Sequence, residues 1–175
     1  MAQPDLFQRL APVVSNSGAT FSPCRQYRYR LWRVWGDGNH RCVFVGLNPS
    51  TADETRDDPT IRKCVGFSKR WGFGAIDMLN LFAWRSTDPT GLLSVDDPVG
   101  SDNDRTLAEV LSFAHRVVWA WGRHNARVRK LVAARLGAWH AVPKVCDVGT
   151  LGRADDGSPR HPLMLAYSTP FEVSR

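Results

Sequence analysis

The sequence lacks the long apolar runs and the leader that would indicate a membrane or secreted protein. No apolar stretch in its 175 residues approaches the ~20 residues of a membrane helix. The first ten residues, MAQPDLFQRL, lack a basic stretch followed by an apolar one. With 23% charged and 43% hydrophobic residues, the composition also excludes a disordered or fibrous chain. We therefore expect a soluble cytoplasmic protein with no membrane association, and the oligomeric state stays open.

Cysteine is sparse, and its spacing excludes the common cysteine-based metal centres. The four cysteines form no CxxC pair and no Cys/His pair at zinc spacing, so neither a zinc site nor an iron–sulfur cluster is expected. Cys42 and Cys146 lie in apolar strand-like runs, and Cys64 lies on the apolar face of a predicted helix. These positions indicate buried, reduced thiols, as in a cytosolic protein.

Lysine is scarce among the basic residues. Of the 23 basic residues four are Lys and the other 19 are Arg, and the net charge is +6. The guanidinium group of arginine is better suited than the ammonium group of lysine to bind phosphate and carboxylate, which favours a polyanionic ligand. The alternative is a GC-rich genome that places Arg on solvated faces. From His115 to Cys146 there are seven Arg or Lys and no acidic residue, whereas Asp53–Asp58 holds four carboxylates, so we expect a polarised surface.

The chain contains no internal repeat and is predicted to form one domain. Residues 1–23 are expected to be an irregular lead-in, and residues 24–175 a single α/β domain. Residues 27–35 alternate large and basic side chains, and GDGN separates them from the apolar run 41–47. This pattern predicts a β-hairpin whose first strand is at a sheet edge and whose second strand enters the core.

Strands and helices then alternate along the rest of the chain. Asp58-Pro59 predicts the start of a helix over 59–71, and Ser101 with Asp104 predicts a capping box ahead of a second helix. The other predicted elements are strands over 75–82, 115–122 and 142–148 and a helix with its apolar stripe over 128–136, closed by Gly137. We expect a three-layer α/β sandwich with a central, mainly parallel four-stranded sheet plus the N-terminal β-hairpin.

Ligands of such folds bind at the carboxyl ends of the strands, where four segments carry polar groups. GLNPS follows the strand that ends near Val45 and holds Asn48 in a constrained turn, although such a turn also forms for backbone reasons alone. Asn80 lies inside an apolar strand end, where a buried amide needs a partner. Trp121-Gly122-Arg123-His124 ends a strand at a helix start, and Arg160-His161-Pro162 fixes a histidine before proline.

Taken together, these four segments resemble the motifs of the uracil-DNA glycosylase superfamily. GLNPS is similar to its first motif in the variant that carries Asn, MLNLF to its LLLN strand, VVWAWGRHNARV to its strand ending WGxxA, and RHPL to its HPS motif. The resemblance spans residues 41–163. GLNPSTAD, DDPT and GxPRHPL resemble more closely an uncharacterised bacterial family, the domain-of-unknown-function family 1643, and that membership by itself supplies no function.

The glycosylase resemblance implies a role for each matching residue. Asn48 would orient the water that attacks the sugar C1′, Asn80 would hydrogen-bond an extruded base, and His161 would stabilise the charge on the departing base. Leu163 or Met164 would fill the space that the base leaves. The remaining residues implied for the ligand pocket are Gly46, Leu47, Pro49, Ser50 and Trp121, and the implied phosphate contacts are Arg123, Arg127 and Arg160.

The sequence also departs from the superfamily. Ser50 stands where the motif has Gly, and the segment after His161-Pro162 lacks the family's serine-proline. Four carboxylates, at Asp53, Glu54, Asp57 and Asp58, would repel a DNA backbone. Helix capping explains Asp58. For the others three explanations stay open: a Mg²⁺ platform built on Asp53 and Asp57, a substrate other than duplex DNA, or a solvated acidic loop.

The leading hypothesis from the sequence is an N-glycosidase or related hydrolase that acts on a base in nucleic acid or on a nucleoside-like molecule. The alternative is a binding module of the same fold that recognises a nucleotide or modified base without cleaving it. A third hypothesis is a metal-dependent hydrolase that uses Asp53, Asp57 and His161. No cofactor other than Mg²⁺ is implied. The glycosylase hypothesis requires Asn48, Asn80 and His161 to line one cleft, and a nucleic-acid ligand would place arginines of the 115–146 block beside it.

Overall fold

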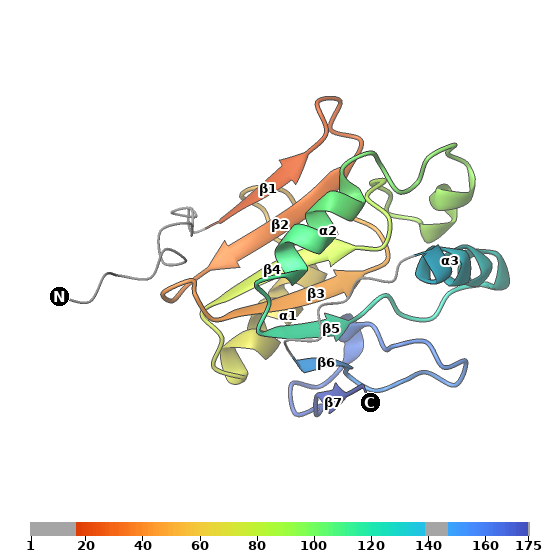
Figure 1. The fold of residues 1–175 in the computed structure, drawn as a ribbon. Coiled ribbons are helices and arrows are strands. Elements are labelled where there is room, and N and C mark those ends of the chain that lie inside the picture. The colour runs from red at the N-terminus through yellow and green to blue at the C-terminus, as the bar shows by residue number, and fades with distance from the viewer. Residues whose placement is uncertain (1–16, 139–146, 175) are drawn as a thin grey trace.

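The computed structural model describes residues 17–138 and 147–174 of the chain. It contains one mixed sheet with strands in the order β1-β2-β4-β3-β5-β6-β7 (Figure 1). The strands are β1 (Ser17–Phe21), β2 (Arg28–Val34), β3 (Arg41–Gly46), β4 (Ala75–Asn80), β5 (Arg116–Trp119), β6 (Asp147–Thr150) and β7 (Glu172–Val173). The helices are α1 (Pro59–Arg70), α2 (Asn103–Leu111) and α3 (Ala126–Ala138), with short 3₁₀ turns η2 (Pro89–Leu93) and η3 (Pro162–Met164).

The centre of the sheet is parallel and its margins are antiparallel. Strand β3 pairs in parallel with both β4 and β5, and β5 pairs in parallel with β6. Strands β1, β2 and β7 then extend this centre with antiparallel pairs. The predicted parallel four-stranded arrangement is therefore the middle of a larger, mixed seven-stranded sheet.

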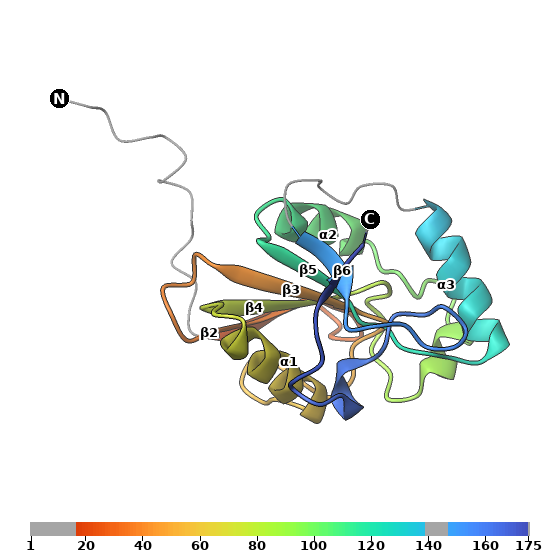
Figure 2. The ribbon, with the colours of Figure 1, turned by 90° about the horizontal axis from the view of Figure 1, so that it is seen from below.

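The helices cover both faces of the sheet, with α2 and α3 on one face and α1 on the other (Figure 2). Alternate residues of β3 face opposite ways: Val43 and Val45 pack in the cluster with α2 and α3, and Cys42 and Phe44 pack in the cluster with α1. Strands buried on both faces read as the continuous apolar runs seen in the sequence. Cys42 and Cys64 are buried, as predicted, and Cys146 lies outside the described residues.

The predicted hairpin between residues 27–35 and 41–47 is wrong. Strand β2 pairs with β1 on one side and with β4 on the other, so β4 lies between β2 and β3. The connection through α1 returns the chain beside β3 at the position that a hairpin partner would occupy, and the alternating pattern of β2 serves β4 equally well. Strand β2 is therefore not an edge strand. The described edge on that side is β1, which forms within the predicted irregular lead-in.

The ends of several elements also differ from the prediction. Helix α1 begins at Pro59 with Asp58 as its N-cap, as predicted. Helix α2 has Asp102 as its N-cap without a side-chain hydrogen bond, so the Ser101 capping box does not form, and Gly137 lies inside α3. The predicted strand 142–148 falls largely outside the described residues, and β6 begins at Asp147. None of the described helices has the length and apolar character needed to cross a membrane.

A buried charge cluster crosses three neighbouring strands near the middle of the sheet. The Asp77 carboxylate of β4 is fully buried and accepts from Arg30 Nε of β2 and Arg41 Nε of β3, each at 2.7 Å. One carboxylate thus bridges two guanidinium groups and ties β2, β4 and β3 together. Buried ion pairs are costly to break because the remaining charge loses its partner.

Candidate functional site

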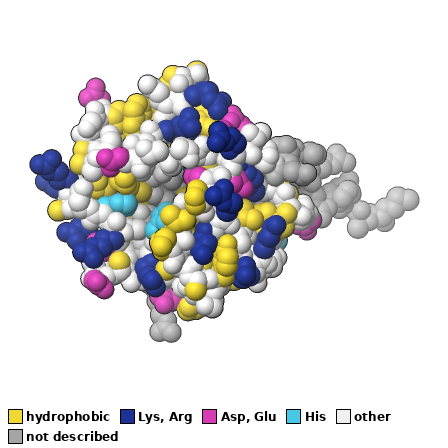
Figure 3. All heavy atoms as spheres, turned by 180° about the vertical axis from the view of Figure 1, so that it is seen from behind, with side chains coloured by type: hydrophobic (Ala, Val, Ile, Leu, Met, Phe, Trp, Pro, Cys, Tyr) yellow, Lys and Arg dark blue, Asp and Glu magenta, His cyan; other side chains and the backbone are white. Residues whose placement is uncertain are grey.

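A cavity of about 230 Å³ opens at the carboxyl ends of β3 and β4, on the face covered by α1. Asn48, Asn80 and His161 all line it, which is the convergence that the glycosylase hypothesis requires. Its other lining residues are Arg28, Gly46, Leu47, Ser50, Asp58, Thr60, Ile61, Met78, Ser86, Thr87, Pro89, Trp121 and His124. The face seen in Figure 3 is hollowed beside histidine side chains. The volume is just below the roughly 300–1,000 Å³ of drug-sized sites, which suits a base or one nucleotide.

Asn80 lies at the end of β4 with its amide buried and without a partner. The residue is 1% exposed, and neither Oδ1 nor Nδ2 has a hydrogen bond to any of the residues that the structure describes. Gly46 lies beside it on β3, and a Cβ at Gly46 would approach Asn80 Oδ1 to 2.9 Å and Met78 Cε to 2.7 Å. The glycine therefore leaves room for the amide. A buried amide with both a free donor and a free acceptor is rare unless a ligand completes it.

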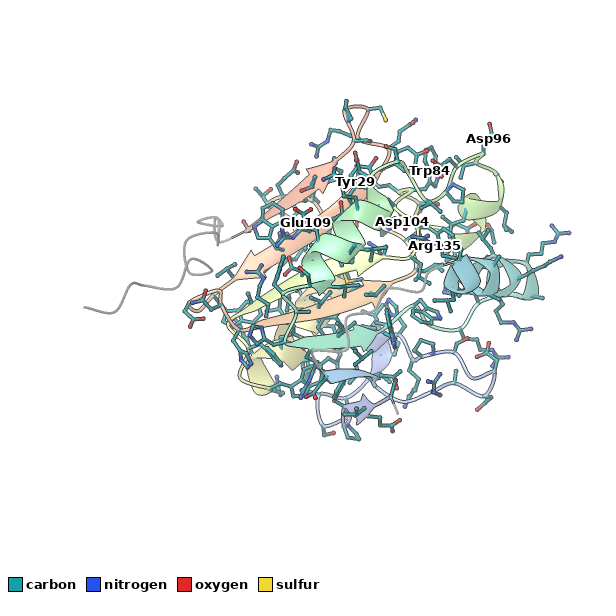
Figure 4. The ribbon with its side chains drawn as sticks, in the orientation of Figure 1. Tyr29, Trp84, Asp96, Asp104, Glu109 and Arg135 are labelled. Atoms are coloured by element: carbon teal, nitrogen blue, oxygen red, sulfur yellow. The ribbon has the colours of Figure 1, made fainter. Side chains whose placement is uncertain are left out.

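The backbone behind Asn80 is held in place by α2 and α3. Asn103 Nδ2 donates to the carbonyls of Asn80 and Leu81, at 3.2 and 3.1 Å, and Arg135 Nε donates to the Leu81 carbonyl at 2.9 Å. Arg135 also pairs with Asp104, and the two side chains point toward each other between the helices (Figure 4). The unpartnered amide of Asn80 is thus carried by a strand end whose backbone is held by hydrogen bonds from α2 and α3.

The Asn48 side chain is oriented by backbone carbonyls. Its Nδ2 donates to the carbonyls of Ser86 at 2.8 Å, Pro49 at 3.2 Å and Trp84 at 3.4 Å. Because carbonyls only accept, the amide nitrogen must face them, and Oδ1 is left as an acceptor without a hydrogen bond from the described residues. Asn48 therefore does two things: its nitrogen closes the loop onto residues 84–86, and its oxygen is available to a water or ligand.

His161 is held as a neutral ring. Its Nδ1 accepts from Leu163 N at 3.3 Å at the start of η3, so the proton of the neutral imidazole is on Nε2. Burial lowers the pKa of His161, the nearby His124 lowers it further, and Asp58 opposes the shift. A Cβ on Gly122 would approach His161 Cβ to 3.0 Å, so this glycine, at a φ of 81°, lets the histidine pack against the end of β5. The site thus holds a neutral hydrogen-bond donor.

Protonation of His161 should destabilise the protein. Because the folded pKa lies below the unfolded value of about 6.5, the unfolded chain binds the proton better, and the stabilisation is lost as pH falls below about 6.5. We expect the Tm of the wild type to fall between about pH 7.5 and pH 5.5, and His161→Asn, which retains a cap acceptor, to flatten this fall. Thermal scans across that range measure it. An equally steep fall in both proteins contradicts the assignment.

Two further lining residues were missed or incompletely interpreted from the sequence. Arg28 of β2 is 2% exposed and lines the cavity. The alternating sequence of the strand does not distinguish it from Arg30 or Arg33. The sequence predicts Asp58 as a helix cap, and its Oδ1 does accept from Ile61 N at 2.9 Å. It also lines the cavity and is the one acidic residue among the described residues that do so. Its place before a helix that starts beside the strand ends is the signal for both roles.

The other three carboxylates of the acidic segment are engaged outside the cavity. Asp53 Oδ1 accepts from Thr55 N and Arg56 N, Glu54 forms a two-pronged ion pair with Arg25, and Asp57 pairs with Arg33 at 2.8 Å. Neither Asp53 nor Asp57 lines the cavity that His161 lines. Within residues 17–138 and 147–174, no group of three or more metal-binding side chains forms. The acidic segment is a loop folded around buried Arg33.

The predicted phosphate contacts lie outside the cavity. Arg123, Arg127 and Arg160 are exposed and do not line it, and Arg123 Nε lies 3.9 Å from the Asp156 carboxylate. Leu163 is 37% exposed and also does not line the cavity. On the face in Figure 3, Lys and Arg are scattered among apolar and acidic side chains. The structure thus unites Asn48, Asn80, His161 and the pocket residues Gly46, Leu47, Ser50 and Trp121, with Pro49 in the same loop, and leaves the arginines at the surface.

The chain is similar to one known protein family. The model of the family described as "Protein of unknown function (DUF1643)" matches residues 28–163, which include every residue that lines the cavity. No curated protein and no solved structure matches the chain. Since the family model covers well over half of the sequence, the chain belongs to the DUF1643 family.

Proposed function

We propose that the cavity binds a nucleobase and that the protein hydrolyses the N-glycosidic bond of a nucleotide or of a base in nucleic acid. The observation that carries this proposal is the buried, unpartnered amide of Asn80 on the cavity wall. One carboxamide offers a donor and an acceptor side by side, and the edge of a nucleobase offers the complementary pair. A base that satisfies both atoms recovers the cost of burying them, which gives affinity and selectivity for that edge.

In this proposal, Asn48 and Asp58 act on the attacking water. Asn48 Oδ1 is the fixed acceptor that orients a water, since its nitrogen is held by three carbonyls. Asp58 supplies negative charge within the same cavity, which takes up the proton of that water and favours the positive charge that develops on the sugar at C1′. The nucleophile is water, the bond that breaks joins C1′ to the base nitrogen, and the products are a free sugar hydroxyl and the free base.

In the same proposal, His161 assists the departure of the base. A neutral ring with its proton on Nε2 donates a hydrogen bond to the negative charge that the leaving base acquires, and it does so without an ion to desolvate. Trp121, 9% exposed and lining the same cavity, offers an aromatic surface for stacking. The base would thus be read by Asn80, stacked by Trp121 and released with the help of His161.

A binding module without catalysis is the second candidate. It is favoured by one observation: Asp58 Oδ1 already caps α1, so the cavity's acidic residue has one oxygen left for chemistry. Such a module would retain the recognition by Asn80 and lack turnover.

Release of free base from defined substrates tests the proposal. The purified protein is incubated with nucleoside monophosphates and with oligonucleotides that carry modified bases, and released base is measured by mass spectrometry. The matched control is Asp58→Asn, because Asn caps a helix as well as Asp does but lacks the charge. We expect a folded protein with its α1 cap retained and a rate lowered about 10²-fold in this variant. Release that is equal in both proteins would identify a contaminating enzyme, and binding without release by the wild type would establish the second candidate.

A further inference from the structure

Arg28 differs from Arg33, the other buried arginine of its strand, in having almost no partners. Its Nη1 donates to the Ala52 carbonyl at 2.9 Å, its Nε is buried without a hydrogen bond, and no carboxylate in the described part of the chain lies within ion-pair distance. Arg33, on the same strand, pairs with Asp57 and donates to the carbonyls of Gly18, Trp32, Asp53 and Arg56. Arg33 is a structural arginine, and Arg28 is left incomplete by the fold.

An irregularity in the strand directs Arg28 into the cavity. The pairing of β1 with β2 skips a residue, since Thr20 faces Arg30 and Phe21 faces Arg28, and Tyr29 is the extra residue of this bulge. Tyr29 lies against Gly100 just before α2, and the Arg30 guanidinium lies over Phe113 just after α2, so both point to the α2 face. The bulge turns Arg28 to the opposite face, where it reaches the Ala52 carbonyl. Bulges that re-aim one side chain are frequent beside binding sites.

The incomplete guanidinium is energetically unfavourable in the ligand-free protein. Burial lowers the pKa of Arg28 to about 10, although the charge of Asp58 across the cavity raises it. A buried charge with one carbonyl partner is costly, and a bound anion removes that cost. The hydroxyls of Ser50, Thr60 and Thr87 line the same cavity and make no hydrogen bond in the described residues, so they can complete the coordination of an anion.

Arg28 and Asn80 are close enough to bind one small ligand. Arg28 N donates to the carbonyl of Ala83 at 2.9 Å, so the Arg28 backbone lies beside Ala83. Ala83 follows Asn80 by three residues in the segment that leaves β4. Three residues span at most about 10 Å. This separation, with both side chains lining one cavity of about 230 Å³, is on the scale of one nucleotide from its base to its phosphate.

We propose that Arg28, with the hydroxyls of Ser50, Thr60 and Thr87, forms a phosphate subsite and that the ligand is a free nucleoside 5′-monophosphate. The proposal rests on the proposed function for the base end of the ligand. A phosphate within a polymer carries a nucleotide on each side, whereas Arg28 is 2% exposed and lines the cavity, so a phosphate must enter the cavity to reach it. The exposed arginines Arg123, Arg127 and Arg160, which a polymer would use, lie outside it.

Calorimetric binding of matched ligands tests the subsite. Wild-type protein is titrated with inorganic phosphate, with a set of nucleosides, with their 5′-monophosphates and with a 5′-phosphorylated oligonucleotide. We expect the preferred monophosphate to bind at least about 10²-fold more tightly than its nucleoside, because a buried charge pair is formed. In Arg28→Met this preference should vanish while affinity for the nucleoside is retained. Tighter binding of the oligonucleotide than of the mononucleotide would overturn the small-molecule assignment.

Thermal stability separates a binding arginine from a structural one. Arg28→Met should leave the Tm of the free protein unchanged or raised, because it removes an uncompensated buried charge, whereas Arg33→Met should lower it. A Tm loss in Arg28→Met as large as in Arg33→Met, or a preserved preference for monophosphates, overturns the proposal. Base release is measured separately. Binding of phosphate that depends on Arg28, without release of base, would refute the hydrolysis and support the subsite. Release of base from nucleosides that is unaffected by Arg28→Met would support the hydrolysis and refute the subsite.

Discussion

Replacement of Asp77 by alanine should lower the free energy of unfolding by about 3–5 kcal/mol, the largest effect on stability that we expect from a single substitution. The carboxylate is fully buried and holds Arg30 and Arg41 at 2.7 Å each, so its loss leaves two guanidinium groups without a counter-charge across three strands. Such a loss is a large part of the roughly 5–15 kcal/mol that stabilises a typical domain. Urea denaturation followed by circular dichroism measures it.

Glu54→Ala is the matched control for this prediction. Glu54 also pairs with an arginine through two oxygens, but Arg25 and Glu54 are 54% and 40% exposed at their side chains. Water replaces the lost partner there, so the expected cost is below about 1 kcal/mol. If the two substitutions cost the same, burial is not what makes the Asp77 cluster important, and the account of how β2, β4 and β3 are held together is wrong.

Sequence patterns predicted the central elements because their signals are local. Asp58-Pro59 places the start of α1 correctly, and the apolar runs of β3, β4 and β5 report burial on both faces. The neighbour of β2 is not a local property. Either β3 or β4 can satisfy the same alternating side chains, and the choice is made by the return of the chain through α1. Strand β1 is short and set in a Pro/Ser/Gly-rich segment, so it carries no comparable pattern.

The candidate site shows the same division. The strand-end rule brings Asn48, Asn80 and His161 to one cavity, as expected from the parallel centre of the sheet. Arg28 could not be predicted, because its direction depends on a bulge that an alternating sequence does not reveal. The acidic loop was open to several interpretations because its partners, Arg25 and Arg33, lie more than twenty residues earlier in the chain. The charges in a sequence segment do not show whether oppositely charged side chains pack against that segment in the fold.

Partner completeness separates three structural polar groups of this protein from two groups on the cavity wall that are available to a ligand. Asp77, Arg33 and Arg135 are buried and fully engaged with neighbouring groups, and they hold strands, a loop and helices together. Asn80 and Arg28 are equally buried, line the cavity and are not satisfied by the fold. Because an unsatisfied buried group destabilises the free protein, substitutions in the two sets should change stability in opposite directions.

Asn80→Leu should therefore separate binding from stability most sharply. Leu branches at Cγ as Asn does, and the substitution removes two buried polar atoms that have no partner, so the free energy of unfolding should stay the same or rise by about 1–3 kcal/mol. Affinity for the base, or the rate of its release, should fall about 10²-fold or more, because the hydrogen bonds that read the base edge are lost. Denaturation and ligand titration on one preparation give both values.

Asn103→Leu is the control, since Asn103 is also a fully buried asparagine but donates to the carbonyls of Asn80 and Leu81. There the same substitution leaves two carbonyls short of a donor, and stability should fall by about 1–3 kcal/mol. Opposite signs for the two asparagines would mark Asn80 as the group kept for a ligand. If Asn80→Leu destabilises as much as Asn103→Leu and leaves ligand affinity unchanged, the Asn80 amide stabilises the fold. The proposal that the cavity binds a base is then wrong.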